Sequence, residues 1–227
     1  MGLRMVDTVR MVRWSGTRRL RIAAIALVAA AALLSSCAST GYHYVKNSSD
    51  KTYFKVPESW KLFDQDAVLK VTGKGLSSSQ LDAIRNLNWE VRFDSNPKPS
   101  LRHFTPSKFD LRYPIGIAEV DGLLQDAADH IALVDLRGLY FNIDSALQSG
   151  QGSVVTYEPV EFDGGFHGVH IVADIVDNGK PITFNEKAVL DQATSKVYAV
   201  VVFCGAKCYE DNQTMIERII NSWTIRN

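Results

Sequence analysis

The sequence lacks the short motifs that identify many enzyme classes. It contains no G-x-S-x-G turn, no G-x-x-x-x-G-K-[ST] phosphate loop, no G-x-G-x-x-G after a strand pattern and no H-E-x-x-H. These motifs supply a nucleophile, a phosphate cradle or a metal site, so an enzyme hypothesis has no named catalytic group. We therefore predict a non-catalytic protein without a cofactor or a metal site. A hydrolase of unrecognised type is one alternative.

The sequence also lacks an apolar run long enough to cross a membrane. Its longest run, residues 22–34 (IAAIALVAAAALL), has 13 residues and follows a stretch with four arginines between residues 13 and 21. A spanning helix needs roughly 20 apolar residues, whereas the core of a signal peptide needs about 7 to 15. We therefore interpret residues 1–36 as a signal peptide. Thr17-Arg18-Arg19 leaves a twin-arginine export route open beside the general one.

The segment Leu34-Ser35-Ser36-Cys37 resembles the lipobox of bacterial lipoproteins. In that motif an aliphatic residue and two small residues precede the cysteine that is acylated and becomes the first residue of the mature chain. The resemblance implies that Cys37 carries a diacylglycerol and a further acyl chain such as palmitate. Two or three acyl chains hold a protein stably, since each buried methylene contributes about 0.8 kcal/mol. The alternative is a secretory signal with an accidental cysteine.

Positive charge is scarce after the signal peptide. Residues 1–36 contain six arginines and one acidic residue, which leaves 19 basic and 24 acidic residues and a formal charge of −5 in the remainder. A nucleic-acid-binding protein needs a basic face that displaces counterions from the phosphates. The composition therefore argues against a nucleic-acid partner.

Cysteine is also rare, with Cys204 and Cys208 as the only residues of this type besides Cys37. Outside the cytoplasmic membrane such a pair favours a disulfide, because no second cysteine or Cys-His pair completes a tetrahedral metal site. The bond would link the strand pattern at 197–203 to a helix that begins near Tyr209. It closes a short loop, which gives a chain-entropy contribution of about 2 kcal/mol. A redox-active pair is the alternative.

The mature chain divides into a short polar segment and one domain. Residues 37–51 comprise the lipidated cysteine and a polar tether, and residues 52–227 form a single domain. Strand patterns cover residues 53–57, 89–93 and 115–120. A helix is expected directly after Ser79, which would be its N-cap. Residues 126–140 also have a helical composition. Residues 95–110 contain three prolines and form a predicted loop.

The last third of the chain is rich in strand patterns. Four runs, at 154–161, 169–176, 182–190 and 196–203, are separated by short turns such as Asp163-Gly164-Gly165. Turns of this length favour hairpins, so the runs predict an antiparallel meander. Apolar residues at 215, 216, 219, 220 and 223 recur at helical spacing and predict a C-terminal helix that covers the sheet. The fold class is therefore α+β, with an antiparallel sheet covered by helices.

Three segments resemble PsbP-like domains. Residues 53–60 (YFKVPESW) are similar to the opening segment of these domains, residues 161–168 (EFDGGFHG) to their Gly-rich hairpin, and Ser222-Trp223-Thr224-Ile225 to their closing element. Together with the cysteine pair, the combination resembles uncharacterised envelope lipoproteins of actinobacteria. The resemblance covers roughly residues 52–226 and implies an α/β/α sandwich whose relatives are mainly binding or assembly modules.

Histidines and aromatic residues are the remaining candidates for a site. His167 and His170 form an H-x-x-H pattern, but residues three apart on a strand point to opposite faces, which favours structural histidines. His130 near Asp126 and Asp129 is interpreted as part of a solvated cluster. Five aromatic residues are candidates for lining a pocket, although core packing is the alternative; these are Trp60, Trp89, Tyr113, Tyr140 and Phe141.

The sequence thus predicts a lipid-anchored protein on the extracytoplasmic face of the cell membrane, with a protein partner in the bacterial envelope. It does not identify that partner. A lipoprotein that carries or senses a small apolar ligand is the main alternative, because a concave apolar site is typical of ligand binding.

Overall fold

The computed structural model describes residues 41–105 and 108–226. The predicted signal peptide and the predicted lipidation site Cys37 lie outside the described residues. Within these residues no helix is both long and apolar enough to span a bilayer.

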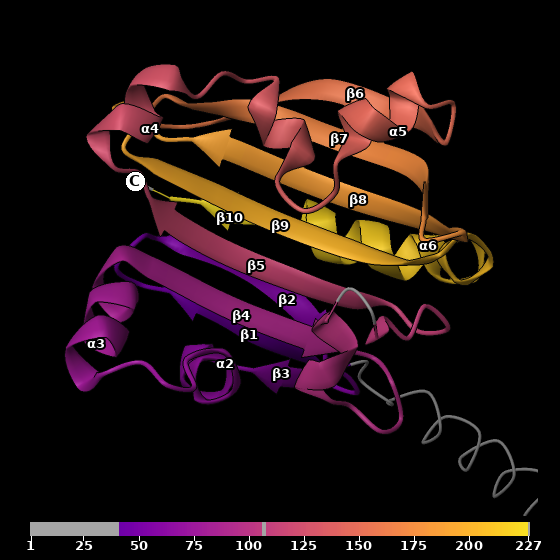
Figure 1. Cartoon of the computed structure of the whole chain (residues 1–227), viewed down its shortest axis with the longest axis horizontal. Helices are drawn as coiled ribbons and strands as arrows, with labels where there is room; N and C mark the ends of the chain where they lie inside the picture. The colour runs from indigo at the N-terminus through magenta and orange to yellow at the C-terminus, as the bar shows by residue number, and fades with distance from the viewer. Residues whose placement is uncertain (1–40, 106–107, 227) are drawn as a thin grey trace, which may run out of the picture. The chain divides into compact units, whose positions relative to one another are not determined.

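A seven-stranded antiparallel sheet forms the centre of the domain (Figure 1). The four strands at the C-terminal end of the described chain form a meander, as the turn pattern predicted. In spatial order the strands are β3 (Lys61–Phe63), β4 (Asn88–Asp94), β5 (Ile115–Gly122), β9 (Lys196–Gly205), β8 (Lys180–Leu190), β7 (Phe166–Asp177) and β6 (Gly152–Phe162). The α+β class with an antiparallel sheet is therefore confirmed.

The hairpin turns contain residues suited to positive φ angles. Gly164 and Gly165 have φ values of 92° and 81° between β6 and β7, and Asn178 and Gly179 have values of 49° and 75° between β7 and β8. Glycine adopts these angles without a steric penalty, and asparagine tolerates them better than most residues. The turns therefore set the register of the hairpins, in which Phe162 lies opposite Phe166 and Asp177 opposite Lys180.

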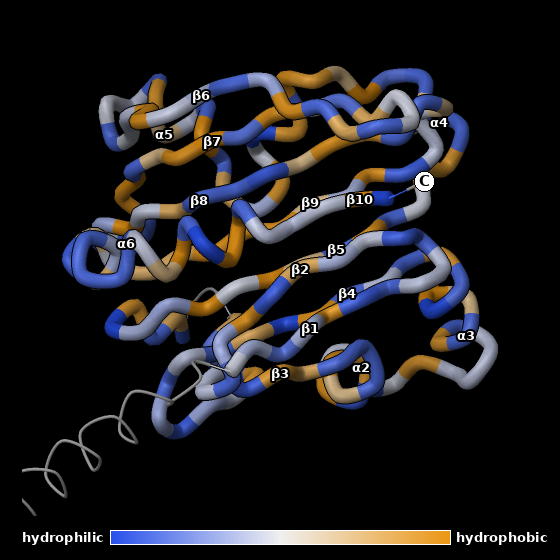
Figure 2. Tube along the Cα trace, turned by 180° about the vertical axis from the view of Figure 1, so that it is seen from behind, coloured by the Kyte–Doolittle hydropathy of each residue, from blue (hydrophilic) through white to orange (hydrophobic). Residues whose placement is uncertain are grey.

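One face of the large sheet is covered by a helix and a second sheet. The helix α6 (Ala206–Asn221) buries Tyr209, Ile216, Ile219 and Ile220, in agreement with the predicted helical stripe. The second sheet has the order β1 (Tyr42–Asn47), β2 (Thr52–Pro57) and β10 (Thr224–Ile225). Figure 2, which views the domain from behind, shows both layers on this side of the large sheet. The aromatic rings of Phe54 and Trp60 pack with Phe93 in the core between them.

The predicted tether does not extend to residue 51. Residues 42–47 form β1, which pairs with β2 along its whole length, and the compact unit begins at Gly41. Val45 and Asn47 are buried there, although the segment is polar in composition. The pairing with β2 satisfies the backbone hydrogen-bonding groups of residues 42–47. The sequence of this segment alone does not reveal the pairing.

The opposite face is covered by a segment that we call the cover, residues 123–148. It contains the helices α4 (Gln125–His130) and α5 (Ile143–Gln148) and the 3-10 helix η4 (Asp135–Gly138). The stretch from 126 to 140, which has a helical composition, is only partly helical, because α4 ends at His130 and Ile131 is extended. Neither α4 nor η4 has a side-chain cap, and α4 buries no residue, so little stabilises a longer helix here. In Figure 1 the cover lies in front of β7 and β8.

Three further helical segments lie near β3 and β4 in the sequence. The 3-10 helix η2 (Leu101–Phe104) interrupts the predicted loop at 95–110, and Phe104 is buried. The helix α2 spans Gln65–Thr72 and contacts β4. The helix α3 (Ser78–Leu87) begins two residues earlier than expected, because the N-cap is Ser77, which forms a reciprocal capping box with Gln80.

A disulfide joins Cys204, near the end of β9, to Cys208 in the first turn of α6. The Cys204 side chain is buried in the cluster that also contains Tyr209 and Ile216. The bond therefore links the strand to the helix at the point where the chain leaves the sheet.

Candidate functional site

The cover exposes an unusual number of large apolar side chains. Leu124 is 71% exposed, Leu133 and Val134 are 42% and 43% exposed, and Leu139 and Leu147 are each 37% exposed. Two exposed residues of β6, Val154 and Tyr157, lie opposite Ala173 and Ile171, which are buried under the cover. They therefore share the face of the sheet that the cover occupies. We call these seven residues the cover surface. Exposed apolar groups on one face of a protein are typical of interaction surfaces.

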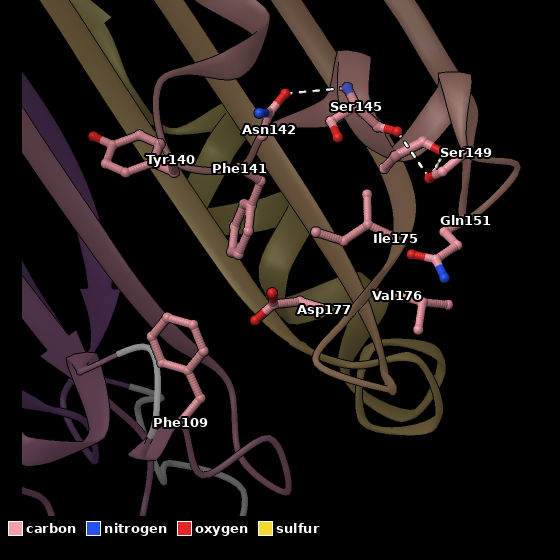
Figure 3. Close-up of a pocket in the computed structure, with 11 residues that line it drawn as sticks. Phe109, Tyr140, Phe141, Asn142, Ser145, Ser149, Gln151, Ile175, Val176 and Asp177 are labelled. Atoms are coloured by element: carbon pink, nitrogen blue, oxygen red, sulfur yellow. Dashed lines mark hydrogen bonds between the residues drawn. The ribbon is translucent and has the colours of Figure 1, made fainter.

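A hollow of about 280 Å³ lies between α5 and the end of β7 (Figure 3). Phe109, Phe141 and Ile175 supply its apolar wall. The Phe141 ring is held in place by two neighbours, since its centroid lies 4.9 Å from that of Phe184 and 5.0 Å from that of Phe203. The polar wall consists of Asn142, Ser145, Ser149, Gln151 and Asp177. This arrangement is able to receive a small apolar group with a polar end.

Two acidic side chains lie on the face of the large sheet that the cover occupies. Glu186 of β8 is 0% exposed, and neither of its carboxyl oxygens has a hydrogen-bond partner among the described residues. Burial raises the pKa of Glu186 well above 4.5, and Glu119 of β5 raises it further. Burial, with a contribution from Asp121, also raises the pKa of Glu119 to about 7. These carboxyl groups therefore favour their neutral forms in the folded chain.

Tyr140 connects the buried acids to the hollow. Its ring lines the hollow, while Figure 3 shows its hydroxyl directed away from Ser145 and Ser149. That hydroxyl is buried beside the Glu119 carboxyl group, and burial raises the pKa of Tyr140 well above 10, with Glu119 and Glu186 contributing. The Tyr140 side chain therefore belongs both to the wall of the hollow and to the surroundings of Glu119 and Glu186.

The aromatic residues predicted as pocket candidates separate into two groups. Tyr140 and Phe141 line the hollow beside α5, whereas Trp60 is a buried core residue whose edge lines a second hollow of about 630 Å³ near Pro97. Trp89 and Tyr113 are partly buried and line neither hollow. Trp89 packs instead against the core that contains Trp60.

The histidine candidates do not meet. His167 contacts the carbonyl oxygen of Gly165 at 3.0 Å, and His170 lies on the other face of β7 between Glu158 and Asn185, at 2.7 and 2.9 Å. His130 is exposed and contacts the Asp126 carbonyl oxygen within its own helix. Across the described part of the chain, no three His, Cys, Asp or Glu side chains are placed to hold a metal ion.

Sequence reasoning missed Glu119 and Glu186. Glu119 stands between apolar residues in Ile117-Ala118-Glu119-Val120, where strand alternation predicts the same face for Ile117 and Glu119. That alternation was the available signal. Glu186 lies in the polar run Asn185-Glu186-Lys187, which gives no indication of complete burial.

Comparison with known proteins shows a likeness of fold. No family model and no curated protein matches the sequence. Solved structures similar to it include the cyanobacterial PsbP protein CyanoP of Synechocystis sp. PCC 6803, with 11% identity, a TM-score of 0.45 and coverage of 84% of this chain and 95% of that one. Another is LpqN, involved in cell envelope biogenesis of Mycobacterium tuberculosis, with 15% identity, a TM-score of 0.41 and coverage of 82% and 91%.

A third similar structure is the Ran-binding protein Mog1p of Saccharomyces cerevisiae, with 6% identity, a TM-score of 0.42 and coverage of 82% of this chain and 96% of that one. A PsbP protein, to which three segments of the sequence bear a resemblance, is thus among the similar structures. Such identities and TM-scores identify neither a ligand nor a partner for this chain.

Proposed function

We propose that this chain is a lipid-anchored, non-catalytic binding or assembly protein of the bacterial cell envelope, located on the extracytoplasmic face of the membrane. The observation that carries the proposal is the cover surface, where apolar side chains such as Leu124, Leu133 and Val134 stand in solvent. Exposing them is unfavourable for an isolated domain, whereas a partner would remove them from water at roughly 25 cal/mol per Å² of apolar area.

The length of the chain next to the predicted anchor supports an association close to the bilayer. Cys37 precedes Gly41 by four residues, and the Gly41 carbonyl oxygen accepts a hydrogen bond of 2.9 Å from the Glu58 amide. Four extended residues reach about 14 Å at most. Acyl chains on Cys37 would therefore keep the start of β1 near the membrane surface.

The anchor is tested by intact mass. Protein extracted from membranes with detergent should have the mass of a chain that begins at an acylated Cys37, and reduction should add two protons for the Cys204–Cys208 disulfide. A Cys37→Ser variant should lose both the acyl mass and the membrane association. An unacylated wild-type chain that keeps residues 1–36 would refute the anchor and the localisation.

The partner surface is tested by site-specific photo-crosslinking in intact cells. A photoreactive residue at Leu133 or Leu139 should give a discrete crosslinked product in the envelope fraction. The matched control is Val71 of α2, which is 46% exposed but lies outside the cover. The same product should disappear when Val134→Asp is added. Equal crosslinking from all three positions, or none from the cover, would refute this surface.

The second candidate function is the carriage or sensing of a small apolar ligand, favoured by the hollow beside α5. Its volume of about 280 Å³ lies just under the usual range for ligand pockets, roughly 300 to 1,000 Å³. Native mass spectrometry of the detergent-extracted protein tests this function. A bound small molecule that is lost in an Ala146→Phe variant would favour it, whereas a ligand-free wild-type protein would exclude it.

A further inference from the structure

The groups that face one another beneath the cover leave several polar atoms without partners. Both carboxyl oxygens of Glu186 and the Arg137 Nε atom are buried and have no hydrogen-bond partner among the described residues, and the Tyr140 hydroxyl is buried beside the Glu119 carboxyl group. Buried polar atoms are nearly always paired in folded proteins, because an unpaired one loses its hydration without compensation. This interface between the cover and the sheet is therefore poorly satisfied while it is closed.

The cover is attached to the rest of the domain mainly by apolar contacts. Most side-chain hydrogen bonds of the cover join residues within it or next to its end, as in the pairs Gln125–Asp129 and Arg137–Asp144. Backbone hydrogen bonds to other segments occur next to its ends, where the Leu123 amide donates to Ser195 and the Val176 amide to Gln151. Leu136, Phe141 and Ile143 are its buried apolar anchors. A segment held in this way opens at a lower free energy than the sheet beneath it.

The charges around the two buried acids are predominantly negative. On this face β9 contributes apolar residues such as Ala199 and Val201. The cation Arg92 pairs with Glu90, and the cation Arg137 pairs with Asp144. The charged and titratable groups that face the acids, or stand at the margin of the same face, are Glu90 and Arg92 of β4, Asp121 of β5, Arg137, Tyr140 and Asp144 of the cover, Tyr157 of β6 and His167 of β7.

We propose that the cover is a proton-controlled lid, closed while Glu119 and Glu186 are protonated and opened when they ionise, and that it regulates the partner surface described above. Opening hydrates both carboxylates and the buried Tyr140 hydroxyl. Opening also exposes apolar side chains that pack with Leu136, including Val169 and Ala188. The regulatory role rests on the proposed function, whereas the proton-dependent opening does not.

The direction of the effect follows from where the protons bind. Burial raises the pKa of Glu119 to about 7, while its ordinary value, which opening to solvent would restore, is 4.5. The closed state is therefore favoured below pH 4.5 and loses stability as the pH rises through 7. Titration of Glu119 alone increases the opening equilibrium constant about 40-fold between pH 5 and pH 7, and Glu186 adds to this increase.

Hydrogen exchange measures the opening without a partner. Protection factors for peptides from residues 131–148 of the full chain in detergent, corrected for the intrinsic effect of pH, should fall about 40-fold or more between pH 5 and pH 7. Peptides from β9 should keep their protection. Glu119→Gln and Glu186→Gln, which retain the side-chain shape, should each reduce the pH dependence, and the double variant should abolish it. Glu210→Gln on the exposed surface of α6 is the matched control and should leave it unchanged.

Three results would overturn the proposal: constant protection of the wild-type cover, an unchanged pH dependence in the double variant, or an equal fall in the β9 peptides, which indicates global unfolding. Because no partner is present, these results leave the proposed function standing. Conversely, a pH-dependent cover in a protein that fails the photo-crosslinking test would support the lid and remove its regulatory role.

Discussion

Replacing Glu186 with methionine is expected to stabilise the domain strongly at neutral pH and much less at acidic pH. The carboxyl group is completely buried without a partner, and its pKa lies well above 4.5 because of that burial. The folded chain thus retains a proton that the unfolded chain releases. The stability contribution of this proton is fully present below pH 4.5 and is lost as the pH rises toward the folded pKa. The penalty that the buried carboxyl group imposes on the folded chain therefore grows as the pH rises from 4.5 to 7.

Methionine occupies a similar volume and cannot ionise, so Glu186→Met removes the penalty and fills the same space. Urea unfolding at pH 4.5 and pH 7 measures the effect. The gain in unfolding free energy should be larger at pH 7 than at pH 4.5, because only the carboxyl group pays for ionising in the folded chain. Glu210→Met on the exposed surface of α6 should change stability by less than about 0.5 kcal/mol at either pH. An equal effect of Glu186→Met at both pH values, or a loss at pH 7, would refute the reasoning.

Three further changes test the packing. Gly168→Val should lower the unfolding free energy by about 3 kcal/mol, because even a Cβ atom at this position would lie 1.9 Å from a carbonyl oxygen of β8. Thermal denaturation measures this effect, and an unchanged melting temperature would contradict the packing. Changing both Cys204 and Cys208 to alanine should cost about 2 kcal/mol, and reductant should lower the wild type to a similar stability but leave the variant unaffected. Trp223→Phe should cost about 1 kcal/mol through loss of the 2.8 Å bond from the indole nitrogen to Thr52, and in a Thr52→Val background the cost should shrink.

The meander could be predicted because its determinants are local. Gly164, Gly165 and Gly179 permit the backbone angles of their turns, and the runs between them have the composition of strands. The C-terminal helix was predictable for the same reason, since Ile216, Ile219 and Ile220 recur at helical spacing and all three are buried. In both cases the signal and the structure involve residues within a few positions of one another.

The errors concern segments whose conformation depends on distant partners. Residues 42–47 are polar in composition and become a strand because β2 pairs with them and β10 continues the same sheet from the other end of the domain. The stretch from 126 to 140 has a helical composition, but Leu136 must enter the cluster with Val169 and Ala188, and the chain does so from a 3-10 turn. Weak local preferences are overridden by such packing.

The candidate site was only partly accessible from sequence. Tyr140 and Phe141 were candidates for lining a pocket, with core packing as the more frequent role of such residues, and both line the hollow beside α5. Glu119 and Glu186 were missed because a carboxylate in a strand is ordinarily exposed, and the environment that neutralises these two is assembled from β5, β8 and the cover.

The amino-acid sequence by itself determined the predicted export signal and lipobox, the turns, the strand and helix periods and the net negative charge of the mature chain. These properties depend on neighbouring residues or on simple sums. Only the tertiary structure decided that Glu119, Glu186 and Tyr140 meet beneath one weakly attached segment whose outer side is apolar. The reason is physical: desolvation and the interaction between like charges depend on distance in space, and chain folding brings together groups that lie far apart in the sequence.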